Sequence, residues 1–572
     1  MAEDGGSRSR VAMIGLDAAD WSLIERYIRD GIMPHTDKLL SQGKFLRLKA
    51  EAGFKAESRW AEILTGRTST ENQYWSIVEF DPSSYTPFYA RSCQGSYFYA
   101  RPDVKSIVFD VPNSVIVEDA HGIQVTAWGA HAAQFPSASR PNHVLPDIDR
   151  RFGVHEGMLS DGHTGWHNDR YLDNLQAAML KGIRQRVDIS AWLQSQQDDW
   201  NLFVTVFPET HVAEHQYLHG FVPEHPLHGT PLADRAADRL RTIFAKVDEA
   251  VGDMVREFDD GRTSVVLFAG HGMETNKSDV IGGVLVPEVL HRLTYGSPLM
   301  EFEPWTDGDD PIMLDDKVLA RHYLEKRLAS PTPVTTGGLR SIPKRMVRRL
   351  RHHLPEAMLN SFERTYWRRP DWWEMHVREP APYHSRDVYS EAGRIELESV
   401  AASSWYRPHW SGMKAFVLPS FSDCHVRLNV IGRERDGVVP AEEYDAACDE
   451  VEAELRSLVD ARTGQPIIDE VLRVRRDDPL ADIGPAPDLI VTFTAVTDVV
   501  RHPTLGVIGP VPIMRAGEHT PEGWVTIVTP GQEHADLGSA EPRDLTATIN
   551  DLLGVPQSPL VTGTSVLDHS DH

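Results

Sequence analysis

Histidines and acidic residues are spaced for metal binding in the segment from Glu209 to His219. His211 and His215 are four residues apart, and His219 follows one helical turn later. On a helix this spacing places imidazole rings on one face, where they suit a metal ion. The acid Glu209 precedes His211 by two residues and is a further candidate ligand. The alternative interpretation is a polar helix face that holds no ion.

Three more candidate ligands stand in separate segments of the chain. His271 lies in the sequence AGHGM after an apolar run, His519 lies in a loop flanked by Gly517 and Gly523, and Asp17 ends the first apolar run. Each has a simpler interpretation, because an isolated histidine is often structural and an aspartate can cap a helix. Imidazole and carboxylate ligands together suit zinc, manganese or iron.

Apolar runs precede several of these polar residues. An unbroken apolar run, a loop and then a helical pattern are typical of buried parallel strands. Ligands of open α/β sheets gather at the carboxyl ends of such strands. The sequence therefore predicts an α/β fold with one shared cleft, and strands at residues 11–16, 105–109, 124–128, 202–207 and 264–268.

Composition narrows the classes of partner. The chain has 572 residues, 41% of them hydrophobic, and a formal charge of −26, which disfavours nucleic acid as a partner. Its three cysteines form no CxxC pair, so a thiolate metal site is not expected. No apolar run approaches the roughly 20 residues that span a bilayer, and the polar N-terminus lacks the apolar core of a secretory signal. We therefore expect no membrane partner and a cytoplasmic location.

The composition of the sequence changes between residues 297 and 404. Residues 344–369 are strongly basic within an acidic protein, and tryptophans lie in and after this stretch. We expect residues 1–296 to form the N-terminal part of the α/β core, 297–404 an inserted cap, and 405–572 the C-terminal part of the core. The basic stretch is either a solvated helix face or a cationic wall that attracts an anionic substrate.

The order of the motifs resembles the alkaline phosphatase superfamily, particularly its type I phosphodiesterase and nucleotide pyrophosphatase branch. That branch has an Asp after the first strand, a nucleophile before W-x-x-x-L-T-G, then D-x-x-x-H, D-H-G-M and a late G-x-H. The corresponding residues here are Asp17, Trp60 to Gly66, His211 to His215, Gly270 to Met273, and Gly517 to His519.

The resemblance implies a fold and a cofactor. The fold would be an alkaline-phosphatase-like three-layer sandwich with a mostly parallel central sheet and an inserted cap region. One or two divalent ions, usually zinc, would sit among Asp and His ligands, activate a Thr or Ser nucleophile and stabilise the anionic transition state. The ligands implied here are Asp17, Glu209, His211, His215, His271 and His519.

The sequence departs from the family pattern at three positions. Ala56 stands where the nucleophile is expected, with Glu57 and Ser58 beside it, and Gly270 replaces the acid of D-H-G-M. His211 replaces the Asp of D-x-x-x-H, with Glu209 two residues earlier. Ser58 is a candidate nucleophile by a shift of register, although a helix N-cap is the alternative. Glu57 is a candidate for the catalytic or metal site.

These substitutions suggest a rebuilt site. One ion would be held through Glu209 or His211, together with His215 and His519. Asp17, Glu57 and His271 would then be remnants of a second site, supporting groups, or ligands in a new arrangement. Without a side-chain nucleophile, water activated by the ion would attack, with His131 or Glu214 as the candidate general base.

The expected function is metal-dependent hydrolysis of a phosphate mono- or diester of a small molecule. Two alternatives remain open at this point. One is a phosphoryl or sulfuryl transferase acting on a small metabolite, since loss of the nucleophile favours direct transfer. The other is a catalytically silent binding protein of the same fold, because one architecture hosts several functions.

Overall fold

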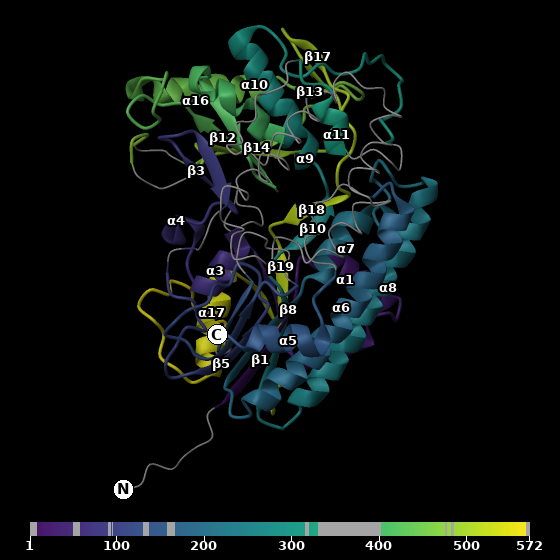
Figure 1. The fold of residues 1–572 in the computed structure, drawn as a ribbon, viewed down its shortest axis with the longest axis vertical. Coiled ribbons are helices and arrows are strands. Elements are labelled where there is room, and N and C mark those ends of the chain that lie inside the picture. Colours follow the sequence, from purple (N-terminus) through teal and green to yellow (C-terminus); the bar gives the residue numbers. More distant parts are fainter. Residues whose placement is uncertain are drawn as a thin grey trace.

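The computed structural model describes residues 9–49, 58–89, 93, 95–129, 137–156, 166–314, 320–329, 402–421, 423–474, 478–481 and 486–567. Its main feature is a nine-stranded sheet with the order β20-β2-β19-β9-β1-β8-β5-β6-β7 (Figure 1). The strands are β1 (Arg10–Leu16), β2 (Lys44–Leu48), β5 (Lys105–Phe109), β6 (His121–Thr126), β7 (Ala138–Arg140), β8 (Leu202–Phe207), β9 (Thr263–Ala269), β19 (Gly523–Val528) and β20 (Ala535–Ala540).

The centre of this sheet is parallel, as the apolar runs predict. Strand β1 pairs in parallel with β8 and β9, and β5 pairs in parallel with β6 and β8. Strands β19 and β7 run antiparallel to their neighbours. The predicted strand at 202–207 is confirmed residue for residue, whereas the strand expected at 124–128 ends earlier, at Thr126. The mostly parallel α/β sheet is thus confirmed.

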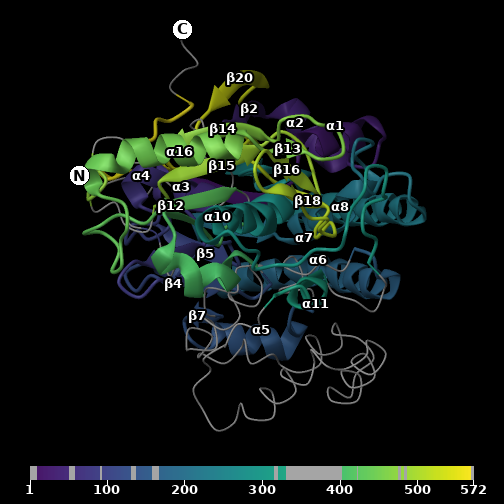
Figure 2. The ribbon, with the colours of Figure 1, turned by 90° about the horizontal axis from the view of Figure 1, so that it is seen from above.

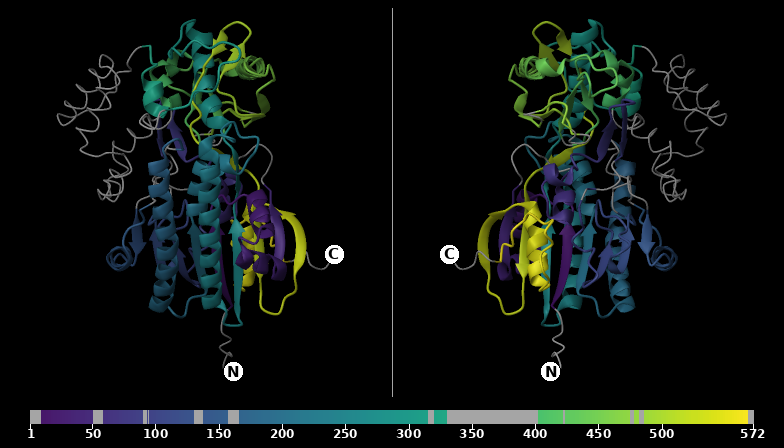
Figure 3. Two further views of the ribbon diagram at one scale, coloured as in Figure 1. Left: turned by 90° about the vertical axis from the view of Figure 1, so that its right-hand side faces the viewer. Right: turned by 90° about the vertical axis from the view of Figure 1, so that its left-hand side faces the viewer.

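Helices cover both faces of the large sheet, which makes three layers. Alternate residues of β1 point to opposite faces, so Ala12 and Ile14 join one apolar cluster while Val11 and Met13 join another. The first face carries α1 (Trp21–Arg29), α2 (Pro34–Gln42), α5 (Val144–Phe152), α6 (Asp169–Gln196), α7 (Glu209–Tyr217) and α8 (Pro231–Phe258). The second face carries α3 (Arg59–Thr65) and α17 (Pro542–Leu552), and Figure 3 shows both sides of the molecule.

A second apolar core lies around a smaller antiparallel sheet with the order β11-β12-β15-β14. It sits above the large sheet in Figure 1 and beside α10 and α16 in Figure 2. Its elements are β11 (Ala415–Leu418), β12 (Cys424–Leu428), β14 (Ile468–Arg473), β15 (Leu489–Phe493), α9 (Ser278–Val280), α10 (Val286–Tyr295), α11 (Ala320–Glu325) and α16 (Tyr444–Arg456).

Besides four 3-10 or π helices, at Leu218–Gly220, Ile281–Leu285, Ala402–Gly412 and Ala441–Glu443, the described part of the chain contains further short elements. They are α4 (Ser69–Asn72), the hairpin of β3 (Val78–Asp81) and β4 (Thr86–Tyr89), the ribbon of β10 (Gly272–Thr275) and β18 (Gly517–Thr520), and the small sheet of β13 (Val459–Asp460), β16 (Val500–His502) and β17 (Gly506–Ile508). No helix within the described residues is both long and apolar enough to cross a membrane. The cytoplasmic location stays a prediction.

The division of the chain at residues 297 and 404 also stays a prediction. Most of 297–404, including the basic stretch at 344–369, lies outside the described residues. In the section from 405 onward, β11, β12, β14 and β15 form the smaller sheet, and the chain returns to the large sheet only with β19 and β20.

Candidate metal centre

Helix α7 begins directly after the central strand β8, at the carboxyl edge of the sheet. Only Pro208 separates Phe207, which ends β8, from Glu209, which begins α7. Every residue of α7 is buried, so its polar side chains must find partners inside the protein. The helical spacing of His211 and His215 places their rings side by side, with centroids 4.4 Å apart.

His519 reaches the same place through the β10–β18 ribbon. Strand β9 ends at Ala269, and β10 starts three residues later at Gly272. Strand β18 pairs antiparallel with β10 in a register that puts His519 opposite Met273. This ribbon carries a residue from near the end of the chain to the carboxyl edge of β1, β8 and β9.

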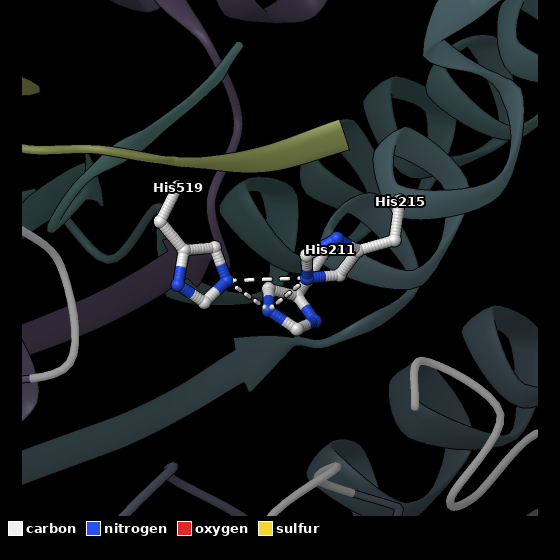
Figure 4. A group of neighbouring side chains, drawn as sticks. All are labelled: His211, His215 and His519. Carbon is white, nitrogen blue, oxygen red and sulfur yellow. Dashed lines mark hydrogen bonds between the residues drawn. The ribbon is translucent and has the colours of Figure 1, made fainter. Parts of the chain in front are cut away.

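The Nε2 atoms of His211, His215 and His519 converge on one point (Figure 4). His215 Nε2 lies 3.2 Å from Nε2 of each of the other two, and the remaining pair is 2.6 Å apart. Two nitrogens bound to one zinc at tetrahedral angles would be about 3.3 Å apart. The two 3.2 Å separations match that spacing, whereas 2.6 Å is shorter than two nitrogens on one tetrahedral ion would be. The donor set and two of its three separations therefore fit a divalent ion with imidazole ligands.

A backbone carbonyl orients the central ligand. His215 Nδ1 lies 2.6 Å from the Gly517 oxygen, and a carbonyl only accepts hydrogen bonds, so Nδ1 carries the proton. In the neutral ring Nε2 then offers its lone pair to the point of convergence. A Cβ on Gly517 would lie 2.7 Å from the Glu214 oxygen, so only glycine lets β18 approach α7 this closely.

Asp17 and His271 form a pair beside the three histidines. Asp17 Oδ1 accepts a hydrogen bond from Trp60 Nε1 at 3.0 Å and lies 3.6 Å from His271 Nε2. The His271 ring is 4.6 Å from the His519 ring, centroid to centroid. Asp17 is not the helix cap considered from the sequence, because Asp20 caps α1. The structure thus brings five of the six expected ligands into one region.

The sixth expected ligand, Glu209, contacts a different residue. Its Oε1 lies 2.8 Å from Nε2 of His155, and both side chains are buried. Nearby, Arg186 donates a 2.6 Å hydrogen bond to Asp110 on the same face of the sheet. Glu209 is not among the three converging residues, and its role as a ligand stays a prediction. Sequence analysis missed His155, because no local pattern marks a histidine that meets its partner only after folding.

The expected catalytic residues are only partly described. Ser58 stands at the N-cap of α3 but makes no capping hydrogen bond; its Oγ instead donates to Glu62 Oε1 at 3.4 Å. Glu57, His131 and Ala56 lie outside the described residues. Gly270 lies between β9 and β10, where a Cβ would meet Ile63 Cδ1 at 2.8 Å. Gly270 therefore supplies no carboxylate beside Asp17 and His271, and the Ile63 side chain lies where a side chain at this position would begin.

Comparison with known proteins gives a family. Residues 11–381 match the model of the type I phosphodiesterase / nucleotide pyrophosphatase family. The chain belongs to that family. The expected kinship with the alkaline phosphatase superfamily is confirmed, and the chain is thereby placed among hydrolases of small phosphorylated substrates that generally use divalent metals. The matched residues include Asp17, α7 and His271 but end before His519, which the β10–β18 ribbon supplies.

Comparisons with solved structures and with curated protein sequences do not bear on the family or the function of the chain. A solved structure of phosphonoacetate hydrolase from Sinorhizobium meliloti 1021 in complex with phosphonoformate is similar at a TM-score of 0.42, with 10% identity and 96% of each chain covered. No curated protein sequence matches the chain. The family assignment rests on the family model alone.

Proposed function

We propose that this protein hydrolyses a phosphate mono- or diester of a small molecule at a metal centre held by His211, His215 and His519. The observation that carries the proposal is the convergence of three Nε2 atoms, from the buried His211 and His215 and the partly exposed His519, at 2.6–3.2 Å. These nitrogens come from a helix and a strand about 300 residues apart in sequence, so the whole fold maintains their arrangement.

Zinc is the ion that we propose, with manganese or iron as alternatives, because imidazole nitrogens suit all three. When bound, it would polarise a phosphoryl oxygen and lower the pKa of a water molecule. The chain's own contribution is orientation, because the Gly517 oxygen holds His215 in the tautomer that offers Nε2. Burial of His211 and His215 limits the access of bulk water on the helix side and strengthens the electrostatic interactions at the site.

The arrangement at Asp17 and His271 supports one ion more strongly than two. Their pair lies next to His519, but Gly270 supplies no carboxylate to complete a second ligand set. We assign Asp17 and His271 a supporting role: they would orient groups near the ion.

The nucleophile is proposed to be Ser58 or water. Ser58 begins α3, whose Trp60 donates to Asp17, so this helix terminus belongs to the same edge of the sheet. Glu62 accepts from the Ser58 hydroxyl and also pairs with Arg59, so it orients that hydroxyl. Glu57 as a further catalytic group and His131 as general base stay predictions from the sequence.

The test is metal content together with hydrolysis of aryl phosphate mono- and diesters. We expect about one zinc per chain for the protein purified without chelator, and loss of both zinc and hydrolysis in His519→Ala. His121→Ala is the matched control, because His121 is exposed on β6. A wild-type protein that retains no metal after zinc loading, or a His519→Ala variant with full zinc and full activity, would refute the proposal.

A further inference from the structure

Oxygen atoms surround Gly272, the first residue of β10. A Cβ on Gly272 would lie 2.6 Å from Asp20 Oδ2 and 2.7 Å from Thr520 Oγ1, and the backbone oxygen of Glu522 would be 3.2 Å from the same Cβ. Thr520 is the residue opposite Gly272 in the β10–β18 ribbon. The φ angle of Gly272 is not in the positive range, so glycine serves here by leaving space. The three oxygens form a cradle that a side chain on β10 would fill.

A buried carboxylate lies beside this cradle. Glu214 on α7 is 0% exposed, and its Oε1 accepts a hydrogen bond from the backbone N–H of Asp20 at 3.2 Å. The negative charges of Asp20 and Glu214 interact, and like charges in such a place repel each other. Within the described part of the chain, Glu214 Oε2 and Thr520 Oγ1 are buried atoms without a hydrogen-bond partner. Buried polar atoms of this kind are costly unless a ligand supplies the missing contact.

A proton on Glu214 or a cation in the cradle would each remove the repulsion between the two carboxylates. The proton would be on Oε2, because Oε1 accepts from Asp20. The resulting O–H group would then lack an acceptor among the described residues, and so would the Thr520 hydroxyl. A cation instead takes lone pairs from both of these oxygens and from the Asp20 carboxylate at once. The unpartnered oxygens therefore favour the cation.

We propose that a calcium ion binds in this cradle. Its protein ligands would all be oxygens, namely two carboxylates, a hydroxyl and a backbone carbonyl, from Asp20, Glu214, Thr520 and Glu522 respectively. Two carboxylates match the charge of a divalent ion, and calcium accepts carbonyl oxygens and water in a flexible geometry, whereas magnesium demands a near-ideal octahedron. Asp20 and Thr520 are half-buried, so water can complete the coordination. The absence of imidazole from this set distinguishes it from the three histidines, which suit zinc.

The proposed calcium site adjoins the segments that carry the metal centre. Its side-chain ligands lie one to three positions from residues of that centre, in the pairs Asp17 and Asp20, His215 and Glu214, and His519 and Thr520. A cation bound to α7, to β18 and to the loop after β1 would hold these three segments together. Glu214, which the sequence offers as a general base, would then be a ligand. The inference goes beyond the proposed function and does not depend on it, because none of its donor atoms belongs to the three histidines.

The experiment is calorimetric titration of calcium chloride into the full chain in calcium-free buffer, with zinc content measured for every variant. We expect the wild type to bind about one calcium ion per chain. Glu214→Gln keeps the acceptor for the Asp20 N–H but removes the charge, so calcium should bind at least about tenfold more weakly. Gly272→Ala fills the cradle and should abolish binding. Glu274→Gln, the matched control, removes a carboxylate from the same strand outside the cradle and should leave the affinity within about threefold.

Thermal unfolding is the second measurement, because a ligand that binds only the folded chain raises Tm. Calcium should raise the Tm of the wild type and of Glu274→Gln, and leave that of Glu214→Gln unchanged. A wild type that binds no calcium overturns the inference in favour of a protonated Glu214. Equal calcium affinity in the wild type and Glu214→Gln also overturns it, as does equal weakening in Glu214→Gln and Glu274→Gln. A wild type that binds calcium but no zinc supports this inference while refuting the proposed function.

Discussion

The carboxylate of Asp17 and the imidazole of His271 lie 3.6 Å apart, from Oδ1 to Nε2, at the ends of neighbouring strands. They occupy the side of the site where the family pattern has a second cation, yet Gly270 contributes no ligand there. Two potential ligands without a third hold a divalent ion weakly, because structural and catalytic sites use at least three protein ligands.

Restoring the acid should therefore restore a second ion. The φ angle of Gly270 is not in the positive range, so its backbone accepts a side chain. The new Cβ would meet only Ile63 Cδ1, and Ile63→Val removes that atom. We expect the zinc content of Gly270→Asp/Ile63→Val, measured by mass spectrometry, to rise from about one to about two per chain. Ile63→Val alone is the control, and equal zinc in both variants would show that Asp17 and His271 do not form a second site.

Glu209 is predicted to stabilise α7 through His155, which distinguishes it from the three histidines. Glu209→Ala leaves a buried imidazole nitrogen without its 2.8 Å partner, which should lower the free energy of unfolding by about 1–3 kcal/mol. Zinc content should stay unchanged. Chemical denaturation of Glu209→Ala, His155→Ala and the double variant measures the coupling between the two residues. A loss of zinc from Glu209→Ala at unchanged stability would instead make Glu209 a ligand.

Ser58 can be tested against a serine that shares its partner. Ser69 Oγ donates to the same Glu62 Oε1, at 2.8 Å, and Ser58 Oγ does so at 3.4 Å. If Ser58 is the nucleophile, Ser58→Ala should lower kcat for phosphate esters at least about a hundredfold, whereas Ser69→Ala should leave kcat within about threefold. Comparable rates for both variants would leave water as the attacking group.

Much of the large sheet could be predicted because its signals are local. The unbroken apolar run before Asp17 and the run at 202–207 each mark a buried strand without reference to any other segment. The spacing of His211 and His215 likewise predicts a shared helix face. These features depend only on residues that are neighbours in the chain.

The features that could not be predicted depend on contacts between segments far apart in the sequence. His519 reaches the other histidines only because β18 pairs with β10 in one register, and a shift by one residue would point its side chain to the opposite face. The sequence around Arg515 gives no sign that its guanidinium group would donate hydrogen bonds to the Asp279 carboxylate and the Phe421 oxygen. The smaller sheet was not predicted either, since strand partners are not visible in a single apolar run.

His219 follows His215 by one helical turn but takes no part in the metal group. Its side chain is buried, and neither of its ring nitrogens has a hydrogen-bond partner within the described part of the chain. Burial lowers the pKa of His219 to about 3, with a smaller contribution from the neighbouring His225. The His219 ring packs near Trp166 at a centroid distance of 6.2 Å, so it behaves as an apolar core residue.

Because its pKa is lower in the folded than in the unfolded chain, His219 makes the protein less stable in acid. Between about pH 6.5 and pH 3 the unfolded chain binds a proton at this position and the folded chain does not, so stability falls as the pH falls through this window. His219→Phe should remove this contribution, which amounts to about 2 kcal/mol at pH 5 relative to pH 7.5. Urea denaturation at both pH values, with chelator present so that metal release does not contribute, measures the difference. His121→Phe, the same change at an exposed site, should leave the pH dependence as it is; an unchanged pH dependence in His219→Phe would contradict the prediction.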